Sequence, residues 1–149
     1  MKMYPEKKED CEDKILENLR DTNKKYDSNH LLALFKMYDF DNGVITLCKK
    51  LGMRDDLLNF YISKNKDEDI LDLCREHGRE EVNLWIHALK YFVKPEYKKE
   101  YYLPDILEEL SLIENLSPLP ILSILSKNKN IPYRYVKEFF LSKYSLFIF

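Results

Sequence analysis

The chain has 149 residues, and its 24 basic and 26 acidic side chains leave a net charge of −2. This length is typical of one ordinary domain. The mixed charges disfavour a nucleic-acid binder, which concentrates positive charge on one surface. Three glycines are too few and too scattered for the usual glycine-rich phosphate-binding loops or for the many turns of an all-β fold. The three dispersed cysteines indicate reduced thiols rather than a disulfide framework.

The apolar pattern predicts an all-α fold. Residues 1–27 are polar, and we expect them to be partly helical or disordered. From residue 28 to residue 149, apolar residues recur three and four positions apart, as they do in amphipathic helices. The clearest runs are Val44, Leu47, Cys48 and Leu51; Ile70, Leu73, Cys74 and His77; Trp85, Ala88, Leu89 and Phe92; and Leu103, Ile106, Leu107 and Leu110.

Glycine, aspartate and proline mark the expected helix ends. Gly52 and Gly78 follow apolar helices, where a left-handed residue without a Cβ is favoured. Asp41 and Asp67 precede the next apolar runs and are expected to be N-caps. Pro118 should begin a helix. Pro104 should end or kink a helix that begins near residue 96.

Two segments of the chain repeat without a gap at an offset of 26 residues. Residues 29–52 read NHLLALFKMYDFDNGVITLCKKLG, and residues 55–78 read DDLLNFYISKNKDEDILDLCREHG. Each unit predicts a helical hairpin that shares its core with its neighbours, so the expected fold class is an α-solenoid of stacked helical hairpins. The residues expected to carry this structure are Leu31, Leu32, Leu47, Cys48, Gly52, Leu57, Leu58, Leu73, Cys74, Gly78 and Trp85.

No motif in the sequence predicts an active site, a cofactor or a metal centre. Asp39 to Gly43 resemble the start of a calcium loop, but the glycine and the final acid are misplaced. The histidines have no zinc-site spacing. Cys48 and Cys74 occupy equivalent apolar positions and are expected to pack as small core residues. We therefore expect no catalytic residue, and the chain to be a non-enzymatic protein.

Several stretches resemble the late α-solenoid of the vacuolar protein sorting-associated protein 11 family. They are LLALFKMYDFDNGVITLCKKLG, ILDLCREHG, NLWIHALKYF, ENLSPLPILSILSKN and YRYVKEFFLSK, in that order, and they cover about residues 29–143. The resemblance implies a scaffold segment of the endolysosomal tethering complexes HOPS and CORVET. Full-length members of the family also carry a β-propeller and a RING zinc domain, neither of which we expect in this sequence.

The resemblance implies partners and a location. The partners would be other tethering-complex subunits, not nucleic acid, and the chain would be cytoplasmic and peripheral on late endosome, lysosome or vacuole membranes. The apolar end of the chain, residues 144–149, is expected to be covered by a helical partner subunit. Two alternatives stay open: another clathrin-repeat or TPR-like adaptor, and a helical-repeat RNA-binding protein.

Overall fold

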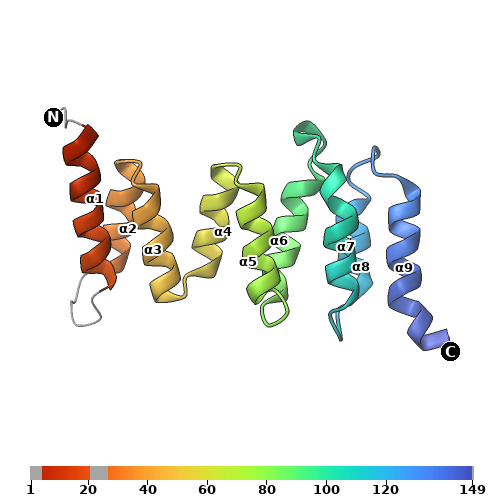
Figure 1. Cartoon of the computed structure of the whole chain (residues 1–149). Coiled ribbons are helices and arrows are strands. Elements are labelled where there is room, and N and C mark those ends of the chain that lie inside the picture. Colours follow the sequence, from red (N-terminus) through yellow and green to blue (C-terminus); the bar gives the residue numbers. More distant parts are fainter. Residues whose placement is uncertain (1–4, 21–26, 149) are drawn as a thin grey trace. The chain divides into compact units, whose positions relative to one another are not determined.

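In the computed structural model, the backbone is described for residues 5–20 and 27–148, and the side chains for residues 11–18 and 27–143. Within these ranges every regular element is a helix (Figure 1). The elements, in chain order, are α1 Pro5–Arg20, α2 Ser28–Met37, α3 Asp41–Leu51, α4 Arg54–Ser63, α5 Asp67–His77, α6 Val82–Val93, η1 Pro95–Tyr97, η2 Glu100–Tyr102, α7 Leu103–Ser111, α8 Pro118–Leu125 and α9 Tyr133–Ile148.

The chain divides into two compact units, Met1–Phe60 and Tyr61–Phe149, with the boundary inside α4. In the first unit, α3 packs against both α1 and α2. The division that the sequence predicted, between residues 27 and 28, stays a prediction.

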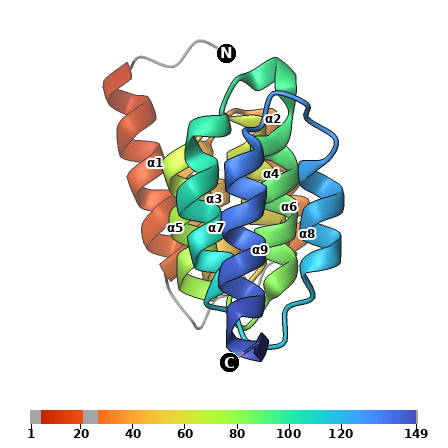
Figure 2. The same ribbon diagram turned by 90° about the vertical axis from the view of Figure 1, so that its right-hand side faces the viewer.

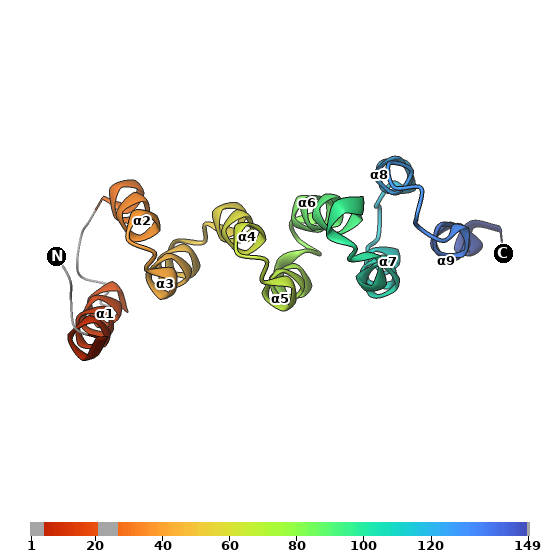
Figure 3. The same ribbon diagram turned by 90° about the horizontal axis from the view of Figure 1, so that it is seen from above.

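In the second unit, consecutive helices alternate between two layers. Viewed along the helix axes, α5 and α7 lie in one row and α6 and α8 in the other (Figure 3). Helix α6 contacts α5, α7 and α8, and α9 contacts both α7 and α8 (Figure 2). Contacts between adjacent and next-but-one helices are those expected of a helical-repeat protein.

The bounds of the helices reproduce the 26-residue repeat. Helices α4 and α5 begin and end 26 residues after α2 and α3. The turn inside each repeat is also the same, because Asp39 and Asn65 both have positive φ, at 54° and 55°. The next amide bonds back to the helix, from Phe40 N to Phe35 O at 2.8 Å and from Lys66 N to Tyr61 O at 3.0 Å. Each turn is a Schellman motif.

Two expectations about the helix starts were wrong. Asp41 and Asp67 are not N-caps: each is the first residue of its helix, and the N-cap positions are Phe40 and Lys66, without a side-chain cap. The Schellman turn causes this, because it runs directly into the next helix. Both carboxylates still lie in a first helical turn, where negative charge is favourable.

Gly52 and Gly78 fulfil different requirements. Gly52 is left-handed, with φ 68°, as expected. Gly78 is right-handed, with φ −69°, so the prediction of a left-handed residue was wrong there. A Cβ on Gly78 would meet the indole of Trp85 and the carbonyl oxygen of Cys74. Position 78 is therefore small because a tryptophan packs against it.

Pro104 begins a helix instead of ending one. The segment before it forms the two short 3₁₀ turns η1 and η2, and Pro104 lies in the first turn of α7. Proline is favoured there because its missing N–H has no partner to lose. Pro118 begins α8 as expected.

Candidate functional site

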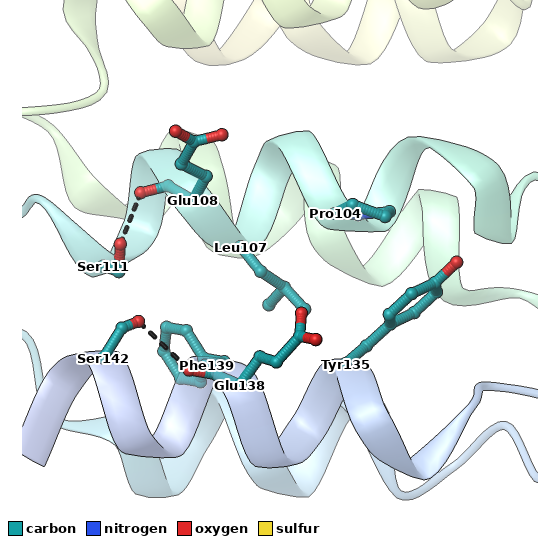
Figure 4. A pocket seen from close by; sticks show the side chains of 8 residues that line it. All are labelled: Pro104, Leu107, Glu108, Ser111, Tyr135, Glu138, Phe139 and Ser142. Carbon is teal, nitrogen blue, oxygen red and sulfur yellow. Dashed lines mark hydrogen bonds between the residues drawn. The ribbon is translucent and has the colours of Figure 1, made fainter.

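A groove between α7 and α9 is the candidate binding site in the described part of the chain (Figure 4). Its cavity volume is about 300 Å³, which is at the lower end of the range for ligand pockets. Each helix contributes four residues at positions i, i+3, i+4 and i+7, which share one helical face. The lining residues are Pro104, Leu107, Glu108, Ser111, Tyr135, Glu138, Phe139 and Ser142.

The floor of the groove is apolar. Leu107 and Phe139 are 4% and 2% exposed, and in Figure 4 both lie between the two helices. Pro104 and Tyr135 stand at the end where both helices begin, and Ser111 and Ser142 stand at the other end (Figure 4).

The rim of the groove presents oxygen atoms that accept hydrogen bonds. Ser111 Oγ donates its proton to the carbonyl oxygen of Glu108 at 2.6 Å, and Ser142 Oγ donates to that of Glu138 at 3.1 Å. The proton of Ser111 is thus directed into its own helix, which leaves oxygen lone pairs as the polar contribution of that hydroxyl. The carboxylates of Glu108 and Glu138 accept only, when ionised.

A second polar cluster joins α5, α6 and the 3₁₀ segment. Lys99 Nζ lies 2.8 Å from Asp67 Oδ1 and 2.6 Å from Tyr91 Oη. Tyr91 Oη is 2.9 Å from Asp67 Oδ1 and 3.0 Å from Asn65 Oδ1. The side chains of Lys99 and Asp67 are only 15% exposed.

The electrostatics of this cluster indicate a structural ion pair between Lys99 and Asp67, supported by Tyr91. Burial opposes the charge on Lys99, but its hydrogen bonds to Asp67 and Tyr91 outweigh that effect, so its pKa is raised. Burial raises the pKa of Tyr91, and the opposing effect of Lys99 does not offset it. A protonated lysine and a protonated tyrosine beside a carboxylate form an ion pair with its hydrogen bonds satisfied, without an activated base or nucleophile.

Buried Asn128 forms a third polar contact. Its Nδ2 donates to Val93 O at 2.7 Å and to Glu100 Oε1 at 3.0 Å, and its Oδ1 accepts from the amide of Asn130 at 2.8 Å. These bonds fix the loop between α8 and α9 to the end of α6. Neither Asn128 nor the Lys99 cluster was evident from the sequence, because most of their hydrogen-bond partners lie 24 to 35 residues away.

The two repeat cysteines are buried thiols. Cys48 and Cys74 are 1% and 0% exposed, as their equivalent positions predicted. Burial raises the pKa of both thiols, with a further contribution from Asp56 at Cys48, and the pKa of Cys74 reaches about 12. Because the thiolate is the reactive form, neither side chain has the character of a nucleophile.

Most of the residues predicted to be structural lie in the interior. Leu32, Leu47, Leu57, Leu58, Leu73 and Trp85 are buried hydrophobic residues. Leu31 is half-buried, and Gly52 is exposed at its helix end. Their contribution to stability stays a prediction.

The apolar end of the chain is described only in part. On α9, Phe139 is 2% exposed, whereas Phe140 and Leu141 are 42% and 51% exposed. The side chains of residues 144–149 lie outside the described residues. The prediction that a partner covers them is therefore untested.

Among the described residues, no group of three or more histidine, cysteine, aspartate or glutamate side chains is arranged to hold a metal ion. Within the same described residues, no helix has both the length and the hydrophobicity needed to cross a bilayer.

The alternating helical layers and the repeated hairpin define a helical-repeat protein. Residues 1–125 match the family model described as PEP5/VPS11 clathrin repeat. The chain belongs to this family, and the predicted fold class, an all-α helical solenoid, is confirmed. The match ends at Leu125, the last residue of α8, so α9 and half of the groove lie beyond it.

Curated relatives agree with the family. The chain is 25% identical over 126 residues to the vacuolar protein sorting-associated protein 11 homolog of Dictyostelium discoideum, covering 85% of this chain and 13% of that protein. The homologs of that name from Mus musculus and Homo sapiens are 23% and 22% identical over 112 residues, covering 75% of this chain and 12% of theirs. The chain thus spans about an eighth of the length of these relatives. No solved structure matches the chain significantly.

Proposed function

We propose that this chain is a non-enzymatic scaffold segment of a vesicle-tethering complex of the HOPS or CORVET type, acting in protein transport to the vacuole or lysosome. The observation that carries the proposal is the family match over residues 1–125, together with relatives named for vacuolar protein sorting. The chain would bind other subunits of the complex and reside in the cytoplasm, peripheral on late endosome, lysosome or vacuole membranes.

The chemistry of the described residues supports a binding role over a catalytic one. The thiols of Cys48 and Cys74 are held protonated, and Lys99 is paired with Asp67. The groove between α7 and α9 combines apolar floor residues with acceptor groups, which suits recognition of a protein segment better than bond cleavage.

The proposal is tested by tagging the chain at its own locus, cross-linking, and identifying the co-purifying proteins by mass spectrometry. We expect identified tethering-complex subunits to be enriched, and vacuolar cargo to be mis-sorted when the chain is removed. Exclusive recovery of coat or ciliary proteins would support a different clathrin-repeat adaptor. Sequencing of the RNA in the same cross-linked sample covers the RNA-binding alternative, which RNA recovered without any tethering subunit would support. Either result would contradict the proposal.

A further inference from the structure

We propose that the groove between α7 and α9 binds a partner segment that carries a lysine or arginine two positions from an apolar residue. This inference rests on the proposed scaffold function, because that function requires protein partners and the groove specifies the chemistry of one of them. It concerns the eight lining residues and a single recognition site within the second unit.

The small volume and the apolar floor of the groove favour an apolar side chain of the partner. The volume of about 300 Å³ is small, and its floor consists of the buried side chains of Leu107 and Phe139. An apolar partner side chain placed in the groove would remove from water its own surface and the exposed surface of Pro104 and Tyr135, which is favourable in proportion to the apolar area covered.

The rim adds a requirement for hydrogen-bond donors. Ser111 gives its proton to Glu108 O, so its hydroxyl oxygen contributes an acceptor to the rim. The carboxylates of Glu108 and Glu138 provide further acceptors. A lysine or arginine supplies only donors and carries the opposite charge, so it complements the rim in both respects.

Nearby cations do not neutralise the groove. No lysine or arginine is among the lining residues. The guanidinium of Arg134 lies 5.2 Å from the ring centre of Tyr135, at one end. Lys143 donates to the carbonyl oxygen of Ile113, after the end of α7. The two glutamates are therefore the charged residues that line the groove itself.

The same features disfavour acidic occupants. A phosphorylated or acidic segment, a nucleic-acid backbone or an anionic lipid headgroup would bring negative charge against both glutamates, and like charges repel. It would also bring acceptors to a rim of acceptors. The rim of the groove thus favours a positively charged residue, and its floor favours an apolar residue close to it in the partner.

The test uses the purified full chain and fluorescein-labelled eight-residue peptides, monitored by fluorescence anisotropy. Each peptide is built from glycine and serine, with one lysine or arginine placed two positions from one leucine. Matched peptides replace the basic residue with glutamate or the leucine with serine. We expect saturable binding of the basic peptides below about 1 mM, weakened by salt because exposed charges are screened, and much weaker binding of both control peptides.

Variants of the chain locate the binding. Glu108→Gln and Glu138→Gln keep the side-chain shape and remove one charge, and each should weaken basic-peptide binding about two- to five-fold, as expected for exposed ion pairs. Ser142→Arg, which places a cation at the rim, should abolish it. Glu109→Gln is the matched control, since Glu109 is the neighbour of Glu108 on α7 but does not line the groove; it should leave binding unchanged. Far-ultraviolet circular dichroism verifies that each variant is folded.

Three outcomes would overturn the inference. They are equal binding of the glutamate-containing peptides, unchanged binding by the Glu108→Gln/Glu138→Gln double variant, and self-association of the chain that Ser142→Arg abolishes while no peptide binds. The last result would assign the groove to a second copy. If tethering subunits still co-purify when the peptides fail, the proposed function stands and only the groove assignment is wrong.

Discussion

The two repeats, which are offset by 26 residues, share a turn and differ at their ends. Asp39 and Asn65 are left-handed residues of equivalent Schellman turns. Gly52 and Gly78 are also equivalent in sequence, yet Gly52 is left-handed and Gly78 is right-handed. The same amino acid is therefore required for backbone conformation in one repeat and for space beside Trp85 in the other.

A second difference lies at the start of α3 and α5. In the first repeat, the rings of Phe35 and Phe40 meet edge to face at 5.0 Å, and a Cβ on Gly43 would collide with both. In the second repeat, Lys66 stands in the place of Phe40, and the position equivalent to Gly43 is Asp69, which is exposed. The glycine is needed only where an aromatic ring covers it.

The largest expected effect is on Trp85, which is 1% exposed and packs against Gly78. Trp85→Ala should lower the free energy of unfolding by roughly 3–5 kcal/mol, because it leaves a large cavity in the core. Chemical denaturation followed by circular dichroism measures this loss. A loss below about 1 kcal/mol would contradict the packed position of the indole.

The glycine pair tests the comparison directly. Gly78→Ala should destabilise by about 1–3 kcal/mol, because its Cβ has no room beside Trp85. Gly52→Ala should cost about 1 kcal/mol, because nothing lies within 4 Å of its Cβ and only the left-handed backbone opposes it.

A double-mutant cycle separates these two causes. Trp85→Ala removes the indole atoms Nε1 and Cδ1 that a Cβ on Gly78 would meet, so it should reduce the cost of Gly78→Ala and leave the cost of Gly52→Ala unchanged. Gly52→Asn should be milder than Gly52→Ala, since asparagine tolerates left-handed backbone better. If Trp85→Ala altered the cost of both glycine variants equally, the distinction between backbone conformation and space would fail.

A smaller effect is expected at the ion pair of the second repeat. Lys99→Met should destabilise by about 1–2 kcal/mol, because it leaves Asp67 and Tyr91 without a charged hydrogen-bond partner. Arg75→Met is the control: Arg75 and Asp72 are 42% and 72% exposed and 3.6 Å apart, so its loss should stay below about 0.5 kcal/mol. If urea titrations gave equal losses of unfolding free energy for Lys99→Met and Arg75→Met, the structural role of the Lys99–Asp67 ion pair would be contradicted.

The pH dependence of that ion pair has a definite sign. The pKa of Lys99 is raised above its ordinary value of 10.5, so the folded chain holds this proton more tightly than the unfolded chain. Its contribution is complete below pH 10.5 and is lost as the pH rises through the higher, folded-state pKa. The alkaline loss should be smaller in Lys99→Met than in the wild-type chain.

The smallest effect concerns the equivalent cysteines. At neutral pH, a thiol-reactive chromophore should modify exposed Cys11 quickly and leave buried Cys48 and Cys74 unmodified until the chain unfolds. Because the pKa of both buried thiols is raised above 9.0, their contribution to stability is present below pH 9 and is lost above it, up to about pH 12 for Cys74. Rapid modification of either buried thiol in the folded chain would break the equivalence of the repeats.

The sequence by itself determined the helices, their repetition and the buried positions that the repeat shares. Helical periodicity is a local property, and Cys48 and Cys74 are buried because each lies on the apolar stripe of its own helix. Sequence patterns within one helix did not predict the role of a residue whose requirement comes from a contact with another element. Gly78 is small because of Trp85, Asp67 is tied to Lys99, and Asn128 is bonded to Val93.

Only the tertiary structure decided the groove between α7 and α9. Its two halves are 31 residues apart along the chain, from Pro104 and Tyr135 to Ser111 and Ser142. Each helix alone carries an ordinary stripe of apolar, acidic and hydroxyl residues. A cavity with an apolar floor and an acceptor-lined rim forms only when the packing of α9 on α7 brings the two stripes face to face, and no periodicity within a single helix encodes which two helices will meet.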